Sequence, residues 1–137
     1  MLDAFGHDTS GIMHDFVPET FARSWVSAWN QGDVDSVLAN FADDVVFVSP
    51  LAATVTGNAE VSGKTALRAY WAKALGLRST RLEFQLDFFT WDEKNRALLI
   101  VYLSTDSGRR VRKAELMHSG PDGLIHRGEA FSGAAIQ

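Results

Sequence analysis

The sequence predicts an α+β fold, because helical periodicity dominates its first half and strand periodicity its second half. Apolar residues recur every three or four positions over residues 21–29 and again over 64–75, as in helices with one buried face. Over residues 82–88 they occupy every second position instead, as in a strand with one face in water. A chain of 137 residues without an internal repeat is expected to form one domain, which we assign to 18–137 behind an N-terminal arm of residues 1–17.

Three helices are expected in the first half of the chain. Pro18 suits the first turn of a helix, and the polar break at residues 30–33, which contains Gly32, ends that helix. Asp33 then caps a second, short helix, since its carboxylate can accept free amide hydrogens of the first turn. The third helix is expected over 64–75, and Gly76 ends it.

Five strands are expected alongside these helices. The first covers Val45–Ser49, and a loop rich in small and polar residues follows it from Ala52 to Gly63. Residues 97–103 are apolar on both strand faces, so both faces of the sheet need cover. The helices can cover one face, and a second copy of the chain covers the other most economically, so we expect a homodimer through the outer sheet face. The four later strands are antiparallel and are joined by turns at 92–95, 107–108 and 120–123.

Composition excludes several classes of function. With 46% hydrophobic and 22% charged residues, the chain is typical of a globular protein, and it contains no apolar run of the ~18 residues that span a membrane. Its first residues, MLDAFGHD, lack the basic start of a secretory signal, so we expect a cytoplasmic protein. The net charge of −4 argues against a nucleic-acid partner. We expect no metal and no cofactor, because there is no cysteine and metal-ligand spacing is absent among His7, His14, His118 and His126.

The turn at Ser107-Gly108 sets a register for the hairpin around it. If it is a two-residue turn, Asp106 faces Arg109, and Tyr102 therefore lies opposite Lys113. Side chains alternate between the two faces of a strand, so Tyr102 and Lys113 share a face with every second residue of their strands.

The next hairpin brings an acid and an imidazole to the same face. If residues 120–123 form a four-residue loop, Ser119 faces Leu124 and Glu115 lies opposite Gly128. Glu115 then has His126 as a diagonal neighbour, and Gly128 leaves space beside the carboxyl. The shared face is predicted to contain Tyr102, Lys113, Glu115, Met117, His126, Gly128 and Ala130.

The segment from Trp25 to Pro50 contains an ordered set of motifs. It reads N-Q-G-D-V-D after the first helix, then F-A-D-D, then a strand that ends at Ser49-Pro50. This order resembles the start of an NTF2-like domain of the SnoaL-like and ketosteroid-isomerase-like type, and the resemblance covers about residues 18–133. It implies a cone-shaped fold in which a curved antiparallel sheet carries three helices on its concave face. It also implies a homodimer and a pocket inside the cone.

The resemblance also assigns residues to the pocket. In ketosteroid-isomerase-like relatives the strand that corresponds to 113–119 has an inward acid at the position of Glu115. Strand alternation independently predicts the same face for Glu115. The relatives have a catalytic aspartate at the position of Ser49 and a tyrosine at that of Trp25. A serine without an activating base does not shuttle protons at neutral pH, so steroid isomerisation by that mechanism is not expected. The expected pocket lining is Trp25, Trp29, Ser49, Trp71, Lys113, Met117, Gly128 and Ala130.

The sequence therefore favours a protein that binds a small apolar or carbonyl-bearing molecule. As an enzyme it would be a cofactor-independent isomerase, cyclase or lyase that uses Glu115 as acid and base, assisted by His126 or Tyr102. A non-catalytic ligand-binding or dimerisation module is the competing class, in which Glu115 only forms a buried pair that joins two strands. An epoxide-hydrolase-like enzyme is a further alternative, but it needs Arg112 and Glu129 to face inward, against the strand alternation.

Overall fold

The computed structural model describes residues 16–136, which form helices and a single six-stranded sheet. The predicted N-terminal arm therefore lies, up to residue 15, outside the described residues. The helices are α1 (Pro18–Asn30), α2 (Val34–Leu38), α3 (Pro50–Thr56) and α4 (Lys64–Gly76). The strands are β1 (Phe41–Val48), β2 (Glu60–Ser62), β3 (Glu83–Asp92), β4 (Ala97–Asp106), β5 (Arg109–Ser119) and β6 (Ile125–Ile136).

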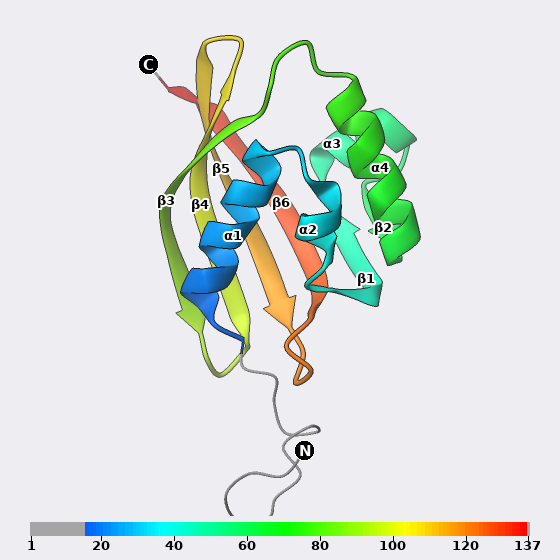
Figure 1. Cartoon of the computed structure of the whole chain (residues 1–137), viewed down its shortest axis with the longest axis vertical. Coiled ribbons are helices and arrows are strands. Elements are labelled where there is room, and N and C mark those ends of the chain that lie inside the picture. The colour runs from blue at the N-terminus through cyan, green and yellow to red at the C-terminus, as the bar shows by residue number, and fades with distance from the viewer. Residues whose placement is uncertain (1–15, 137) are drawn as a thin grey trace, which may run out of the picture.

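The sheet has the order β2-β1-β6-β5-β4-β3, and its long strands curve around the helices (Figure 1). Helix α1 lies across β3, while α4 packs on β1 and α2, so the helices cover the concave face of the sheet. Neighbouring strands are antiparallel except β1 and β6, which are parallel and bring the first strand of the chain beside the last. This arrangement confirms the predicted α+β fold class with a curved sheet.

The helix ends follow from local chemistry. Pro18 occupies the first turn of α1, and Gly32 adopts a φ of 68°, a left-handed conformation that suits glycine, where the chain turns toward α2. Asp33 caps α2, because its Oδ1 accepts a hydrogen bond of 3.1 Å from the backbone N–H of Ser36. The two predicted helix boundaries in this segment are confirmed.

The segment after β1 differs from the predicted loop. Residues 50–56 form α3, and residues 60–62 form the short edge strand β2. The reason is a complete set of helix-end signals: Ser49 Oγ accepts a hydrogen bond of 3.2 Å from the N–H of Leu51, and Gly57 ends the helix at a φ of 86°. Strand β1 also starts earlier than the predicted Val45, because residues from Phe41 already pair with β6.

A bulge in β3 changes which aromatic side chains face the core. The pairing of β3 with β4 shifts between Leu86 and Phe88. Phe84 and Leu86 pack against the core, but after the bulge Phe89 takes the inward position, and Phe88 is 51% exposed on the outer face. The prediction that Phe88 shares a face with Phe84 is therefore wrong. The bulged residue, Asp87, lies 3.3 Å from the guanidinium of Arg112.

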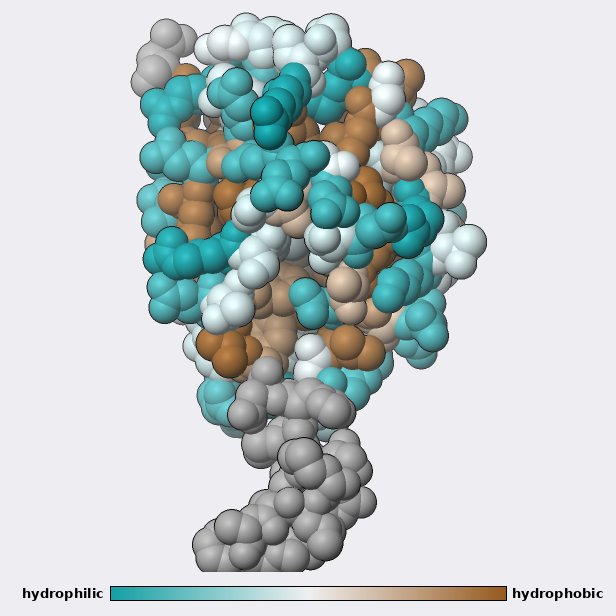
Figure 2. Space-filling view, viewed as in Figure 1, coloured by the Kyte–Doolittle hydropathy of each residue, from teal (hydrophilic) through white to brown (hydrophobic). Residues whose placement is uncertain are grey.

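The core lies between the helices and the concave sheet face. It is rich in aromatic side chains, which come from α1, β1, α4 and β4. Figure 2 shows that the helical side of the molecule is largely hydrophilic, with apolar residues visible between the helices. The fully buried large side chains are Leu38, Phe41, Val45, Leu67, Leu98, Ile100, Met117 and Ile125.

Candidate functional site

A cluster of polar side chains is buried inside this aromatic core. Glu115 of β5 is 5% exposed, and Tyr102 of β4, Tyr70 of α4 and Ser49, which caps α3, are similarly buried. Buried polar groups carry a desolvation cost and are normally held by hydrogen bonds. Their presence in one apolar interior marks this cluster as the candidate site.

Glu115 and Tyr102 are joined directly. Lys113 pairs with Tyr102 across β4 and β5, as the two-residue turn predicts, so Glu115 is a diagonal neighbour of the tyrosine. The Tyr102 hydroxyl donates a hydrogen bond of 3.0 Å to Glu115 Oε2. Burial raises the pKa of Glu115 to about 8, although the Tyr102 hydrogen bond and the charge of Lys113 oppose this rise. The carboxyl is therefore mainly protonated at neutral pH.

Tyr70 and Ser49 form the second buried pair. Ser49 Oγ lies 3.2 Å from the Tyr70 hydroxyl oxygen, within hydrogen-bond distance. Burial raises the pKa of Tyr70, the Ser49 hydrogen bond opposes this, and the charge of Glu115 raises it further. Sequence reasoning did not assign Tyr70 to the site, because its helical spacing indicates only a core position. Its hydroxyl belongs to the cluster only through the tertiary packing of α4 on the end of β1.

Tryptophan side chains of α1 and α4 pack against Tyr102 and against one another. The ring of Trp25 lies edge-on to that of Tyr102 with centroids 5.1 Å apart, and Trp29 contacts Trp71 at 4.9 Å in the same way. The Nε1–H groups of Trp25 and Trp29 are buried and have no hydrogen-bond partner. A buried donor without a partner costs about 1–3 kcal/mol. These two indole groups are therefore available to an acceptor that enters the core.

The remaining predicted lining residues lie on the same sheet face, in a different register. Met117 pairs with Gly128 and Glu115 with Ala130, so the predicted pairing of Glu115 with Gly128 is wrong by two residues. Gly128 does not leave space beside the carboxyl either, because the ring of Phe47 fills it. A Cβ on Gly128 would lie 2.8 Å from that ring.

His126 lies away from Glu115, which corrects the predicted diagonal contact. Its Nε2 is 2.9 Å from Asp122 Oδ2, and its side chain is 41% exposed. The physical reason is an irregularity beside the turn: Ser119 pairs with Ile125 rather than with Leu124. Ile125 is fully buried, so the residue after it points outward. Within residues 16–136 no group of three or more acidic or histidine side chains is arranged to hold a metal ion.

Arg112 and Glu129 also lie outside the cone. Arg112 pairs with Leu103 on the outer sheet face and contacts Asp87, and Glu129 pairs with Leu116. Arg112 and Glu129 therefore cannot hold a water molecule between them inside the cone, as strand alternation predicts. This arrangement removes the basis of the epoxide-hydrolase-like alternative.

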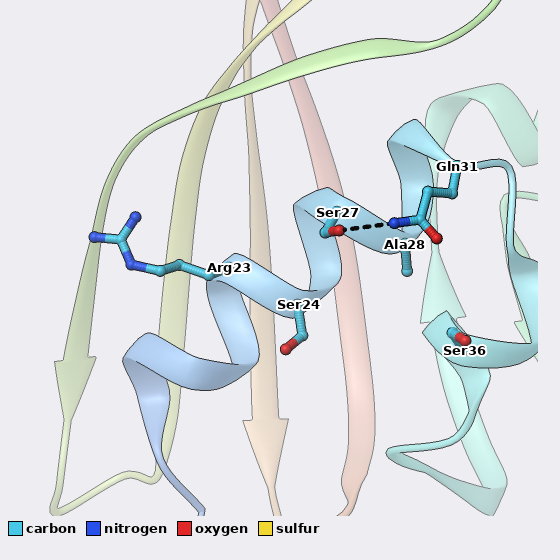
Figure 3. Close-up of a pocket in the computed structure, with 6 residues that line it drawn as sticks. All are labelled: Arg23, Ser24, Ser27, Ala28, Gln31 and Ser36. Carbon is cyan, nitrogen blue, oxygen red and sulfur yellow. Dashed lines mark hydrogen bonds between the residues drawn. The ribbon is translucent and has the colours of Figure 1, made fainter.

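Two surface pockets lie near the helices, and neither of them includes Glu115. The first, of about 380 Å³, lies between α1 and α2 and is lined mainly by polar side chains (Figure 3). In it Gln31 Nε2 donates a hydrogen bond of 3.2 Å to Ser27 Oγ, while Arg23 is paired with Glu19 at 2.9 Å. The second, of about 350 Å³, lies between α3, β2 and α4 and is mainly apolar. Tyr70 lines this second pocket.

Solved structures with the same fold come from several bacteria. A SnoaL-like protein of unknown function from Burkholderia thailandensis is 28% identical, with a TM-score of 0.75 over 90% of this chain and 99% of that chain. A provisionally assigned ketosteroid isomerase from Kribbella flavida is 15% identical, with a TM-score of 0.67 over 86% and 78%. A provisionally assigned polyketide cyclase from Sinorhizobium meliloti is 20% identical, with a TM-score of 0.66 over 84% and 95%. At these low identities, the similarity to the last two structures shows a shared fold and nothing more.

A search of curated proteins gives no match. In the part of the chain that the structure describes, no helix is both long and apolar enough to cross a membrane. The family model of the SnoaL-like domain matches residues 22–127, which contain most of both the helices and the sheet. The chain therefore belongs to the SnoaL-like domain family.

Proposed function

We propose that this chain binds a small, mainly apolar molecule with a carbonyl group inside the cone, and that Glu115 exchanges a proton with it. One observation carries the proposal: the Glu115 carboxyl is buried among aromatic side chains and held by a tyrosine, and this burial raises its pKa to about 8. A group whose pKa lies near the working pH can both give and take a proton efficiently. Proton transfer next to a carbonyl, as in an isomerase or a cyclase, is the reaction that this site would suit.

Each polar group has a distinct role in this proposal. Tyr102 holds Oε2 of Glu115, and among the described residues it is the only side chain that hydrogen-bonds this carboxyl. The other carboxyl oxygen is then left for the ligand. The unpartnered indole groups of Trp25 and Trp29 would donate to the carbonyl oxygen, where negative charge develops as the neighbouring carbon loses a proton. Ser49 has no basic partner, and its hydroxyl caps α3, so it takes no proton.

The experiment follows proton exchange directly and needs no known substrate. A neutral bicyclic ketone, α-tetralone, is incubated with the protein in heavy water, and loss of the proton signal next to its carbonyl is followed by NMR. The wild-type protein is expected to accelerate this exchange, and Glu115→Gln is expected to lower the rate by roughly 100- to 10,000-fold. Glu83→Gln, the same change at an exposed position on β3, serves as the matched control. Equal rates for the wild type and Glu115→Gln would assign Glu115 a structural role.

A non-catalytic dimerisation module, in which Glu115 only joins two strands, is the second candidate, and one observation favours it. Aromatic rings pack closely around Tyr102, the hydrogen-bond partner of Glu115, and neither surface pocket is lined by Glu115. In that case α-tetralone shows no accelerated exchange with any variant. Glu115→Gln then changes only the free energy of unfolding.

We further propose that two copies of the chain pair through their outer sheet faces. Phe88, Val101, Ala114 and Phe131 pair in sequence across β3, β4, β5 and β6 and form one apolar row. Phe88 is 51% and Phe131 is 45% exposed, and Leu103 and Leu116 extend the apolar surface on the same face. A contiguous apolar patch on one face of a sheet is typical of an interaction surface. A second copy offers the matching surface.

A further inference from the structure

The apolar pocket between α3, β2 and α4 is the only one of the two surface pockets that contacts the buried polar cluster. We infer that this pocket is the entrance through which a neutral, slender apolar molecule reaches Glu115, with Tyr70 as the first residue of the buried polar cluster that it meets. The inference rests on the proposed function, because it names the route and the ligand class of the same site.

Tyr70 belongs both to the surface pocket and to the buried cluster. It lines the pocket of about 350 Å³, and its hydroxyl lies 3.2 Å from Ser49 Oγ inside the core. Burial raises the pKa of Tyr70, the Ser49 hydrogen bond opposes this rise, and the charge of Glu115 raises the pKa further. On α4, Tyr70 lies one turn after Ala66 and is buried, whereas Ala66 and Ala69 are exposed, so Tyr70 lies at the inner end of the groove that these small residues line. A rotation of one tyrosine side chain would therefore connect the groove to the cluster.

The walls of the pocket select the kind of molecule that can enter. Val61, Ala66 and Ala69 form an apolar lining with short side chains, which leaves room for hydrocarbon. Charged groups occur only on exposed side chains at the rim, Glu60 and Lys73. Burying an unpaired charge among apolar walls is costly, whereas a neutral molecule with one carbonyl can enter without that cost. The pocket therefore favours the same neutral ketones that the proposed reaction requires.

Helix α3 forms a wall of the pocket, and a side-chain hydrogen bond at the rim ties it to α4. Lys73 Nζ of α4 donates a hydrogen bond of 3.3 Å to the carbonyl oxygen of Val55 in α3, across the rim of the pocket. The helix has 7 residues and is followed by Gly57 in the left-handed conformation. Loss of the Lys73 contact would let this short helix move away from α4 and widen the entrance.

Quenching of tryptophan fluorescence by acrylamide tests the route, because acrylamide is a small neutral molecule that must diffuse to a ring to quench it. A Trp91→Phe background leaves Trp25, Trp29 and Trp71 as the only tryptophans, and all three are buried. In this background Ala69→Phe, which fills the groove, is expected to lower the bimolecular quenching constant about fivefold. Lys73→Met, which removes the contact with α3, is expected to raise it about fivefold, the factor that corresponds to one hydrogen bond of about 1 kcal/mol.

Ala72→Phe is the matched control, since Ala72 is also exposed on α4 but does not line the pocket. It is expected to leave the quenching constant unchanged. Ala66→Phe gives a second way to block the groove if Ala69→Phe unfolds. Equal quenching constants in the blocked variants and in Ala72→Phe would overturn the proposal that this pocket is the entrance. This result is independent of the proposed function. Suppose that acrylamide enters by this route but that Glu115→Gln exchanges α-tetralone protons normally. The entrance would then be supported, and the acid–base role of Glu115 would be excluded.

Discussion

Tyr102 and Glu115 are diagonal neighbours on β4 and β5, and the tyrosine hydroxyl donates its 3.0 Å hydrogen bond to a carboxyl that is mainly neutral at pH 7. The two effects on the carboxyl have opposite signs. Burial favours the neutral form, while a donated hydrogen bond and the nearby charge of Lys113 favour the ionised form. Their balance leaves the pKa of Glu115 near the working pH, where small changes in the surroundings change its protonation.

The free energy of unfolding is expected to fall as the pH rises from about 4.5 to about 8. Burial raises the pKa of Glu115 from 4.5 to about 8, so within this range the unfolded chain releases the proton while the folded chain keeps it. The stabilisation is complete below pH 4.5 and is lost as the pH passes the folded pKa, with a slope of at most about 1.4 kcal/mol per pH unit. Urea unfolding of the wild type and Glu115→Gln across this range measures the difference. A difference that does not vary with pH would contradict the raised pKa.

Tyr102→Phe is expected to raise the pKa of Glu115 further. The change keeps the ring that packs on Trp25 and Phe84 but removes the donor that stabilises the ionised carboxyl. Infrared spectra of the protonated carboxyl against pH measure this shift directly. Tyr70→Phe is the matched control, because it removes a buried hydroxyl that bonds Ser49 instead. A pKa of Glu115 that falls in Tyr102→Phe would show that the hydrogen bond stabilises the neutral form.

The outcome of the two register predictions has a local physical cause. At 107–108 both central residues have positive φ, 51° for Ser107 and 81° for Gly108, which is the two-residue turn that fixes a hairpin register. The loop at 120–123 closes between Gly120 and Leu124, because the Gly120 N–H donates a hydrogen bond of 2.9 Å to the Leu124 carbonyl oxygen, and an irregularity between His118 and Ser119 shifts the pairing after it. Sequence alternation therefore found the face of Glu115 and Tyr102 but not the neighbours that β6 brings to it.

Other differences between the sequence predictions and the structure arise from tertiary packing and local irregularities. The spacing of Tyr70 identifies it as a buried helix residue, but only the position of α4 against the end of β1 brings its hydroxyl to Ser49. Phe88 left its predicted face because of the bulge at Asp87, which strict alternation cannot anticipate. The sequence around α3 contains helix-end signals, namely the Ser49 cap, Pro50 and Gly57. Its small and β-branched residues nevertheless favour a loop when the sequence is considered alone.

Gly128→Ala is expected to destabilise the protein by about 1–3 kcal/mol. Its Cβ would lie 2.8 Å from the ring of Phe47, which is itself packed on Trp71. Chemical denaturation of the variant measures the change. Gly76→Ala, at the end of α4, is the control, because a Cβ there has nothing within 4 Å. Similar losses of stability in the two variants would mean that the Phe47 ring does not fill the space beside Gly128.

Asn30→Ala is expected to lower the free energy of unfolding by roughly 1–3 kcal/mol. The Asn30 side chain accepts a hydrogen bond of 2.7 Å from the N–H of Phe84 and donates one of 2.9 Å to its carbonyl oxygen. It thereby ties the end of α1 to the start of β3. Asn95→Ala removes a similar side-chain contact in an exposed turn and should change stability by about 0.5 kcal/mol or less. Equal effects would argue against this connection.

Phe131→Asp is expected to convert a dimer into a monomer without loss of the fold. The side chain is 45% exposed at one end of the apolar row that runs to Phe88, so a charge there leaves the core intact but would be buried in the interface. Removal of a central aromatic contact typically costs 2 kcal/mol or more, roughly a 30-fold weaker association. Sedimentation velocity at micromolar concentration measures the change, and Leu77→Asp, at a 69% exposed position after α4, is the control. A wild-type protein that sediments as a monomer, or a Phe131→Asp variant that remains dimeric, would exclude this face as the interface.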